Sequence, residues 1–149
     1  MYGIQIIDQA VSAIRGQWED SQGVIIDALQ PETPSMEQYV RIMGIEFRCL
    51  VENEINGTNI LRIEEKSKSC MGTYKGPVIL VARYVQPSVY GTLRKMELNF
   101  ADTAGNYNIQ YTKGRKVIFH LSHTGEKAPV NNNKNYPIFQ EAGLKVIFY

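Results

Sequence analysis

The residues that could carry chemistry gather in the segment Asn-Phe-Ala-Asp-Thr-Ala-Gly-Asn over positions 99–106. An acidic residue at the end of a strand lies where α/β sheets place their ligands, so Asp102 could bind a metal ion or orient a water molecule. The alternative is a tight turn in which Asp102 and Asn106 hydrogen-bond to the backbone and Gly105 takes a positive φ angle. Residue types and spacing leave both interpretations open for the motif turn Asp102, Thr103, Gly105 and Asn106.

Three glutamates, Glu46, Glu52 and Glu54, form a second candidate site. They share the even-numbered face of an ideal strand, so their carboxylates could converge on one divalent cation. A metal-dependent nuclease also needs a lysine near such a cluster, to stabilise developing charge and to position water. Glu54 stands two residues after Glu52, so the lysine would have to come from another element, as Lys66 or Lys113. A solvated polar strand face is the other interpretation.

Basic side chains outnumber acidic ones in the middle of the chain, and several tyrosines lie among them. A surface that tracks phosphates combines positive charge with aromatic rings, and a solvated charged face is the other interpretation. The candidates for nucleic-acid contact are Arg83, Tyr84, Arg94, Lys95, Lys113, Arg115 and Lys116, with Tyr74, Tyr107 and Tyr111 as further aromatic residues.

Several other kinds of site are not predicted. His120 and His123 have no third histidine and no neighbouring cysteine, which argues against zinc. No segment approaches the spacing of a phosphate-binding loop. The sequence therefore predicts no cofactor, and Mg²⁺ or Mn²⁺ would be needed only by a nuclease.

The composition is that of a soluble globular domain. The 149 residues suit one domain over 1–149, and 44% hydrophobic with 21% charged residues is close to the average. The net charge of +1 provides no global attraction to DNA or to anionic membranes. The longest mostly apolar run, over 78–82, is far too short to span a membrane. Two cysteines without a metal-ligand pattern indicate a reducing compartment, so we expect a cytoplasmic protein without membrane contact.

The elements that must position these residues follow from hydrophobic periodicity. The pattern predicts helices over 1–16, over 59–68 with Thr58 as cap, and from Pro87 onward. It predicts strands over 24–29, 39–42, 45–54, 78–82, 99–102, 107–111 and 116–121. The strand at 78–82 is apolar throughout and should be covered on both faces, whereas the strand at 45–54 should have one buried and one polar face. The order over 78–102 predicts a β–α–β unit with parallel strands, so the fold class is α/β with a mixed sheet.

The last part of the chain is expected to lack regular structure over much of its length. Residues 122–143 are polar and rich in turn formers, which predicts a flexible loop. Residues 144–149 are apolar, and the chain stops on Lys-Val-Ile-Phe-Tyr as if cut.

Two segments together resemble a known family. Residues 78–107 combine the strand Val-Ile-Leu-Val-Ala-Arg-Tyr-Val, a proline, an amphipathic helix and the segment Leu-Asn-Phe-Ala-Asp-Thr-Ala-Gly-Asn-Tyr. This pattern resembles the bacterial AbiEi-type antitoxin regulators of type IV toxin–antitoxin systems. Residues 139–148, Phe-Gln-Glu-Ala-Gly-Leu-Lys-Val-Ile-Phe, resemble the junction at which that family continues into a winged-helix DNA-binding domain. The resemblance makes 144–149 the start of this junction.

The resemblance implies a fold and a function. It implies a restriction-endonuclease-like domain, in which helices flank a central mixed sheet and active members carry Glu-x-Lys. If Glu52-Asn53-Glu54 stands in that place, Glu54 replaces the lysine. The resemblance therefore implies a catalytically silent binding or dimerisation module of a transcriptional regulator, with DNA or a second copy as partner. The alternatives are a divalent-metal-dependent nuclease and a purely structural scaffold.

Overall fold

A computed structural model of the chain describes residues 2–17, 26–29 and 37–127. The helices are α1 (Tyr2–Gln17), α2 (Ile60–Thr73) and α3 (Tyr90–Lys95), with a short 3₁₀ helix, η1 (Pro87–Val89), directly before α3. The strands are β1 (Ile26–Leu29), β2 (Tyr39–Ile42), β3 (Ile45–Ile55), β4 (Val78–Val85), β5 (Asn99–Asp102), β6 (Tyr107–Lys113) and β7 (Lys116–His123). No helix of these described ranges is long and apolar enough to cross a membrane.

The seven strands form one mixed sheet in which their spatial order follows the chain. The strands β1, β2 and β3 pair antiparallel, β3, β4 and β5 pair parallel, and β5, β6 and β7 pair antiparallel. Parallel neighbours need a crossover connection, which is usually a helix: α2 lies between β3 and β4, and η1 with α3 lies between β4 and β5. The predicted mixed sheet and the predicted β–α–β unit over 78–102 are confirmed.

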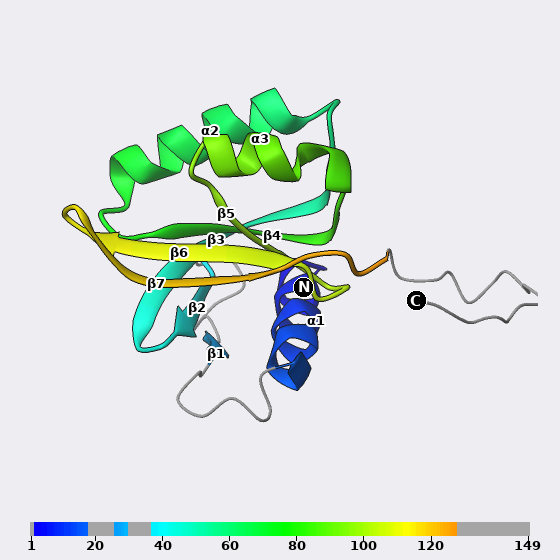
Figure 1. The fold of residues 1–149 in the computed structure, drawn as a ribbon, viewed down its shortest axis with the longest axis horizontal. Coiled ribbons are helices and arrows are strands. Elements are labelled where there is room, and N and C mark those ends of the chain that lie inside the picture. The colour runs from blue at the N-terminus through cyan, green and yellow to red at the C-terminus, as the bar shows by residue number, and fades with distance from the viewer. Residues whose placement is uncertain (1, 18–25, 30–36, 128–149) are drawn as a thin grey trace, which may run out of the picture.

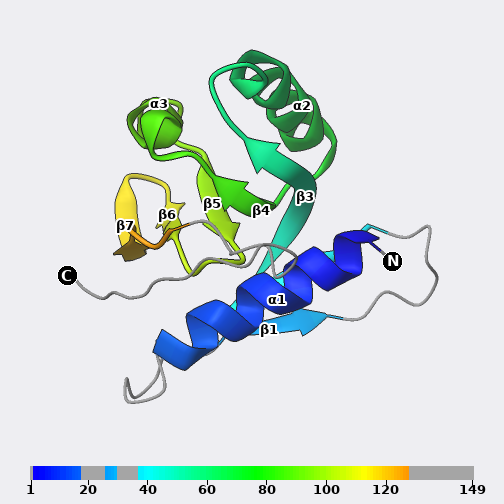
Figure 2. The same cartoon turned by 90° about the vertical axis from the view of Figure 1, so that its right-hand side faces the viewer.

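Helices cover both faces of the sheet. Figures 1 and 2 show α1 on one face and α2 with α3 on the other. The strand β4 contributes to both cores, because Ile79 and Val81 pack on the α1 side while Leu80 and Ala82 pack on the side of α2 and α3. This explains why residues 78–82 are apolar without alternation, as predicted.

The neighbouring strand β3 departs from its predicted pattern. Phe47 and Cys49 are buried on the α1 side, as expected. Leu50 points to the opposite face and is also buried, in the core beneath α2. The prediction of a polar face is therefore wrong at the centre of β3, because α2 covers that part of the face and Leu50 packs beneath it.

The helix α2 begins and ends later than predicted. Its first turn follows Asn59, and the side chains of Asn56 and Asn59 accept hydrogen bonds from the backbone there, whereas Thr58 does not cap the helix. The hydrophobic pattern of residues 59–68 predicts Ile60, Leu61 and Ile63 on the inner side of the helix, and Ile60 and Ile63 do face the core. Leu61 is instead 69% exposed, because one residue along a helix rotates a side chain by about 100° away from the buried stripe.

The sheet curves strongly around Phe47. The aromatic ring of Phe47 in β3 lies 6.3 Å from the rings of both Tyr111 in β6 and Phe119 in β7. The strands β4 and β5 separate these elements in the sheet, so a flat sheet would hold the rings well beyond contact. This curvature buries one face of the β6–β7 hairpin and leaves its other face beside α3.

The expected loop over 122–143 begins too early. Ser122 and His123 belong to β7, where they pair with Asn108 and Tyr107 of β6, so the prediction is wrong at these two residues. Residues 124–127 have no regular secondary structure. The rest of that loop and the predicted junction over 144–149 lie outside the described residues.

Phe47→Ala tests the role of the curved sheet in stability. The side chain of Phe47 is fully buried, so its removal should lower the free energy of unfolding by about 3–5 kcal/mol. Urea denaturation followed by circular dichroism measures the change. Leu61→Ala is the control and should change stability by less than about 0.5 kcal/mol; equal losses in both variants would contradict this account of the core.

Candidate functional site

The carboxylate of Asp102 lies in a buried turn between β5 and β6 and is fully inaccessible to solvent. Its Oδ1 accepts hydrogen bonds from the backbone N–H groups of Ala104 (3.0 Å) and Asn106 (2.9 Å). Its Oδ2 accepts from the backbone N–H of Val85 (3.0 Å) and from the side-chain Nδ2 of Asn106 (2.9 Å). A carboxylate has about four lone-pair sites, so these four donors occupy the group completely.

Burial and hydrogen bonding act in opposite directions on the pKa of Asp102. Burial is the larger effect and raises the pKa above its ordinary value, while the donors on Asn106, Val85 and Ala104 lower it in part. Burying the carboxylate is thus costly, and the four N–H groups offset much of that cost.

The other residues of the motif turn also have structural roles. Gly105 has a φ of 101°, and a side chain there would collide with the amide of Gln17, whose Nε2 donates to the Gly105 carbonyl (2.9 Å). The hydroxyl of Thr103 donates to the carbonyl oxygen of Arg83 at the end of β4 (2.8 Å). These contacts fix the turn to α1 on one side and to β4 on the other.

Asn106 extends the same network to the segment that follows β7. Its Oδ1 accepts from the backbone N–H of Glu126 (2.8 Å), and its Nδ2 donates to the Glu126 carbonyl oxygen (3.0 Å) as well as to Asp102. Every residue of the motif turn therefore contributes to a closed structural network, which is the second of the two interpretations above.

The three glutamates of β3 do not come together. Glu46 pairs with Arg41 of β2 (3.1 Å), and the Glu54 carboxylate accepts from the side-chain amide of Gln86. Residues 46 and 54 are about 26 Å apart along an extended strand. Within the described ranges, no group of three or more His, Cys, Asp or Glu side chains could hold a metal ion.

Glu52 has a different environment from the other two glutamates. Its carboxylate contacts Arg62 (3.0 Å) and Lys66 (3.2 Å), both on α2. Burial raises the pKa of Glu52, but the hydrogen bonds and positive charges of these two side chains outweigh it, and the pKa lies below its ordinary value. A lysine from another element thus does reach the carboxylate, as the nuclease interpretation requires.

The sheet register places Glu52 and Asp102 in one row. Glu52 is paired with Ala82 of β4, and Ala82 with Asp102 of β5. The row two residues earlier, formed by Leu50, Leu80 and Phe100, lies in the core under α2 and α3. Side chains two residues apart on a strand share a face, so both carboxylates belong to that face. Two strand spacings separate them by roughly 10 Å.

The residues proposed for nucleic-acid contact divide into two groups. Five exposed cations lie on α3 and at the tip of the β6–β7 hairpin, and none forms an ion pair with another described residue: Arg94, Lys95, Lys113, Arg115 and Lys116. Arg83 instead lines a hollow beside Asp8 of α1. Tyr84 is half-buried, and burial together with the charges of Asp102 and Glu54 raises its pKa.

The other tyrosines proposed as stacking partners do not line the basic surface. Tyr107 is buried in the α1-side core, and Tyr111 packs against Phe119 on the same side. Tyr74 lies at another part of the molecule and donates to the Glu46 carbonyl oxygen (3.2 Å). The prediction of a joint basic and aromatic surface is wrong for these residues, because strand alternation turns the β6 tyrosines inward.

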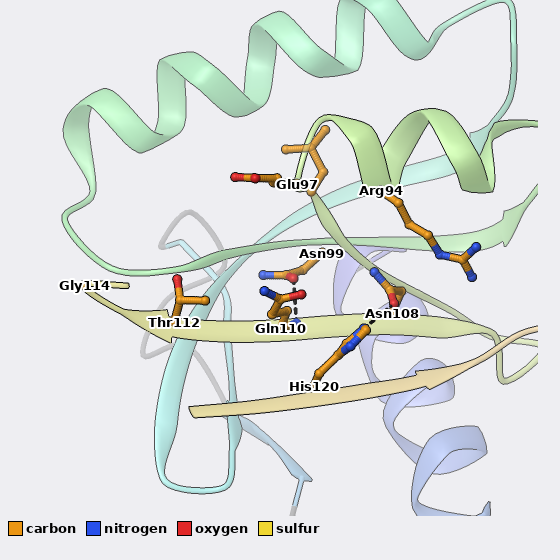
Figure 3. Close-up of a pocket in the computed structure, with 9 residues that line it drawn as sticks. Arg94, Glu97, Asn99, Asn108, Gln110, Thr112, Gly114 and His120 are labelled. Atoms are coloured by element: carbon orange, nitrogen blue, oxygen red, sulfur yellow. Dashed lines mark hydrogen bonds between the residues drawn. The ribbon is translucent and has the colours of Figure 1, made fainter. Parts of the chain in front are cut away.

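A polar groove lies between α3 and the open face of β6 and β7 (Figure 3), with a volume of about 510 Å³. Arg94 extends from α3 at one wall, and Asn108, Gln110 and Thr112 project from β6 opposite. The imidazole Nε2 of His120 lies 2.8 Å from Oδ1 of Asn108. This groove is not among the sites predicted from the sequence, although the alternation of these polar residues with Tyr107, Ile109 and Tyr111 indicates a strand with one polar face.

Asn99 completes the floor of the groove by bridging two strands. Its Oδ1 accepts from the backbone N–H of Gln110 (2.9 Å), and its Nδ2 donates to the Val78 carbonyl oxygen (3.2 Å). The strand β5 pairs with β6 only at Phe100 and Ala101. The Asn99 side chain thus supplies the hydrogen bonds to both neighbouring strands at the residue where β5 begins.

Asp102→Asn tests whether the carboxylate is structural. In the parent, four N–H donors bond to the two carboxylate oxygens. The substitution replaces one of these oxygens with an NH₂ group, which cannot accept from the donors that face it, so we expect a loss of roughly 2–4 kcal/mol in the free energy of unfolding. Chemical denaturation measures it. Asp8→Asn on the exposed face of α1 is the matched control, with a change below about 0.5 kcal/mol; a neutral Asp102→Asn would mean that the network is not needed for folding.

Glu52→Gln tests the interaction with α2 through its pH dependence. Because the pKa in the folded state is depressed, the stabilisation from Glu52 is complete above the unfolded value of about 4.3 and is lost as the pH falls through the lower folded value. At pH 7 the variant should be less stable by at most about 1 kcal/mol, since Arg62 and Lys66 are largely exposed. Urea denaturation between pH 3 and pH 7 should show the difference shrink in acid; a pH-independent difference would contradict the pairing.

We compared the chain with protein-family models, with curated proteins and with solved structures, and none of the three comparisons gave a match. The function is therefore inferred from the contacts of the carboxylates, from the placement of the basic side chains and from the resemblance in residues 78–107.

Proposed function

We propose that this chain is a binding module of an AbiEi-like antitoxin or transcriptional regulator, which docks nucleic acid and turns over no substrate. The observation that carries the proposal is the hydrogen bonding of the buried Asp102 carboxylate. All four lone-pair sites of its carboxylate are occupied by N–H donors. A metal ion or a catalytic water would have to displace buried hydrogen bonds that hold the turn together.

The contacts of the other carboxylates support the same proposal. Glu52 is neutralised by two cations of α2, and Glu46 and Glu54 are engaged with separate partners far apart on β3. A divalent cation needs several oxygen ligands around one point. The arrangement of these side chains instead favours a module that binds without catalysis.

The exposed cations supply the binding surface. Arg94 and Lys95 lie on α3, and Lys113, Arg115 and Lys116 lie on the hairpin. Arg94 lines the polar groove, and so does Gly114, the chain neighbour of Lys113 and Arg115. Positive side chains that form no ion pair with neighbouring acidic residues are available to neutralise phosphates. In the family that the chain resembles, a winged-helix domain supplies the main DNA contact, so this surface would provide an additional one, and a second copy of the chain remains an alternative partner.

One observation favours a second candidate, a metal-dependent nuclease. The Nζ of Lys66 lies 3.2 Å from the Glu52 carboxylate, and Glu52 shares a sheet row with Asp102. An acidic pair with a nearby lysine is the combination that such enzymes use with Mg²⁺ or Mn²⁺. This candidate would require Asp102 to exchange its N–H donors for a metal ion.

The experiment that separates the two functions combines cleavage with binding. The protein is incubated with duplex, branched and single-stranded DNA in Mg²⁺ or Mn²⁺, beside the Glu52→Ala and Asp102→Ala variants. We expect no cleavage by any of them. Fluorescence anisotropy on the same DNA should show affinity falling steeply with salt, with a log–log slope of roughly −3.5 to −4.5 for about five phosphate contacts.

Two results would overturn the proposal. Cleavage by the parent that is lost in either variant would establish the nuclease. A salt-independent affinity, or no binding at low salt, would exclude docking through phosphates and leave the homodimer or the scaffold. Thermal melting of each variant confirms that a lost signal does not come from unfolding.

A further inference from the structure

We propose that the groove between α3 and the β6–β7 hairpin receives one phosphodiester backbone of a nucleic acid and binds it without reading its bases. This inference rests on the proposed function and assigns the place and the mode of docking. The groove volume of about 510 Å³ lies within the range of small-molecule sites. It suits one sugar–phosphate segment and is too small for a whole duplex.

The groove offers hydrogen-bond donors that the protein itself does not use. The guanidinium of Arg94, the amide of Gln110 and the hydroxyl of Thr112 are exposed and form no side-chain hydrogen bond with another described residue. Figure 3 shows these three side chains on opposite walls of the same hollow. Guanidinium, amide and hydroxyl groups are the side-chain groups that contact phosphate oxygens in nucleic-acid complexes.

The lining of the groove also argues against base recognition. None of the described residues that line it is Phe, Tyr or Trp, and the imidazole of His120, which does line it, has its Nε2 2.8 Å from Oδ1 of Asn108. The groove therefore lacks the large aromatic platforms on which successive bases stack. Asn99, whose amide could pair with a base edge, has both ends engaged with β4 and β6. The remaining donors fit the repeating phosphates, which carry no sequence information.

The charges around the groove include cations that favour an anionic ligand and one carboxylate that opposes it. Gly114 lines the groove, and Lys113 and Arg115 are its chain neighbours at the hairpin tip. Glu97 also lines the groove, beyond the C-terminal end of α3, in left-handed backbone with a φ of 58°. Its carboxylate forms no ion pair with another described residue, so it should repel a phosphate placed nearby.

The central test places a negative charge inside the groove and, as a matched control, on the opposite face of the sheet. Gln110→Glu and Gln5→Glu change the net charge equally, and both positions are exposed. Fluorescence anisotropy with a labelled oligonucleotide at fixed salt should show Gln110→Glu weakening binding at least about tenfold, because the new carboxylate repels a phosphate held in the groove. Gln5→Glu on α1 should weaken it less than about twofold, because a distant charge is screened.

A second variant should change the affinity for the oligonucleotide in the opposite direction. Glu97→Gln removes the opposing carboxylate and should strengthen binding about two- to fivefold. Homo-oligomers of the four bases should bind within about threefold of one another, as expected for backbone contacts. Running single-stranded and duplex DNA in parallel identifies which source of phosphodiester backbone the groove accepts.

Each outcome separates this inference from the proposed function. Salt-dependent binding that Gln110→Glu and Gln5→Glu weaken equally would overturn the groove and leave the proposed function standing. A strong base preference that disappears in Gln110→Ala would overturn the backbone mode. Absence of any binding by the parent would overturn both the groove and the proposed function. Chemical-shift changes confined to the Gln110 and Asn108 side-chain amides on titration with the oligonucleotide would support the groove directly.

Discussion

The buried carboxylate of Asp102 is the interaction on which the rest of the structure depends. A carboxylate without contact to water is costly unless its lone pairs are filled, and here four N–H groups fill them. These donors come from the end of β4 and from the turn that leads into β6. Through Asn106 the network reaches Glu126 after β7, and through Gly105 it reaches Gln17 at the end of α1. One side chain thus links parts of the chain that are far apart in sequence.

The engagement of the carboxylates also determines which polar side chains remain available to a ligand. The acidic side chains that could act in catalysis already have partners. Asp102 accepts hydrogen bonds from backbone and amide donors, and Glu52 forms ion pairs with two cations of α2. Among the described residues, five exposed cations without an ion pair lie on α3 and on the β6–β7 hairpin: Arg94, Lys95, Lys113, Arg115 and Lys116. The engagement of Asp102 and Glu52 and the exposure of these cations support the proposal of a module that binds an anionic polymer without cleaving it.

The groove exists because the helices cover only part of the sheet. The apolar residues of α2 and α3 pack over β3, β4 and β5, and Figure 2 shows the hairpin of β6 and β7 extending beside α3. Curvature around Phe47 buries the opposite face of that hairpin against the α1-side core. The exposed face of β6 therefore carries Asn108, Gln110 and Thr112 instead of apolar side chains, and these form the wall opposite Arg94.

The sequence by itself determined the elements whose residues report their own surroundings. The apolar run over 78–82 indicated a strand covered on both faces, and Asp102, Gly105 and Asn106 were recognised as able to form a turn, because both signals are local. What only the tertiary structure decided depends on contacts between distant elements. Periodicity gives the angle between side chains on one element but not what lies opposite. For this reason the pairing of Glu52 with Lys66, the exposure of Leu61, the inward direction of Tyr107 and Tyr111, and the groove beneath Arg94 appeared only when the elements were packed together.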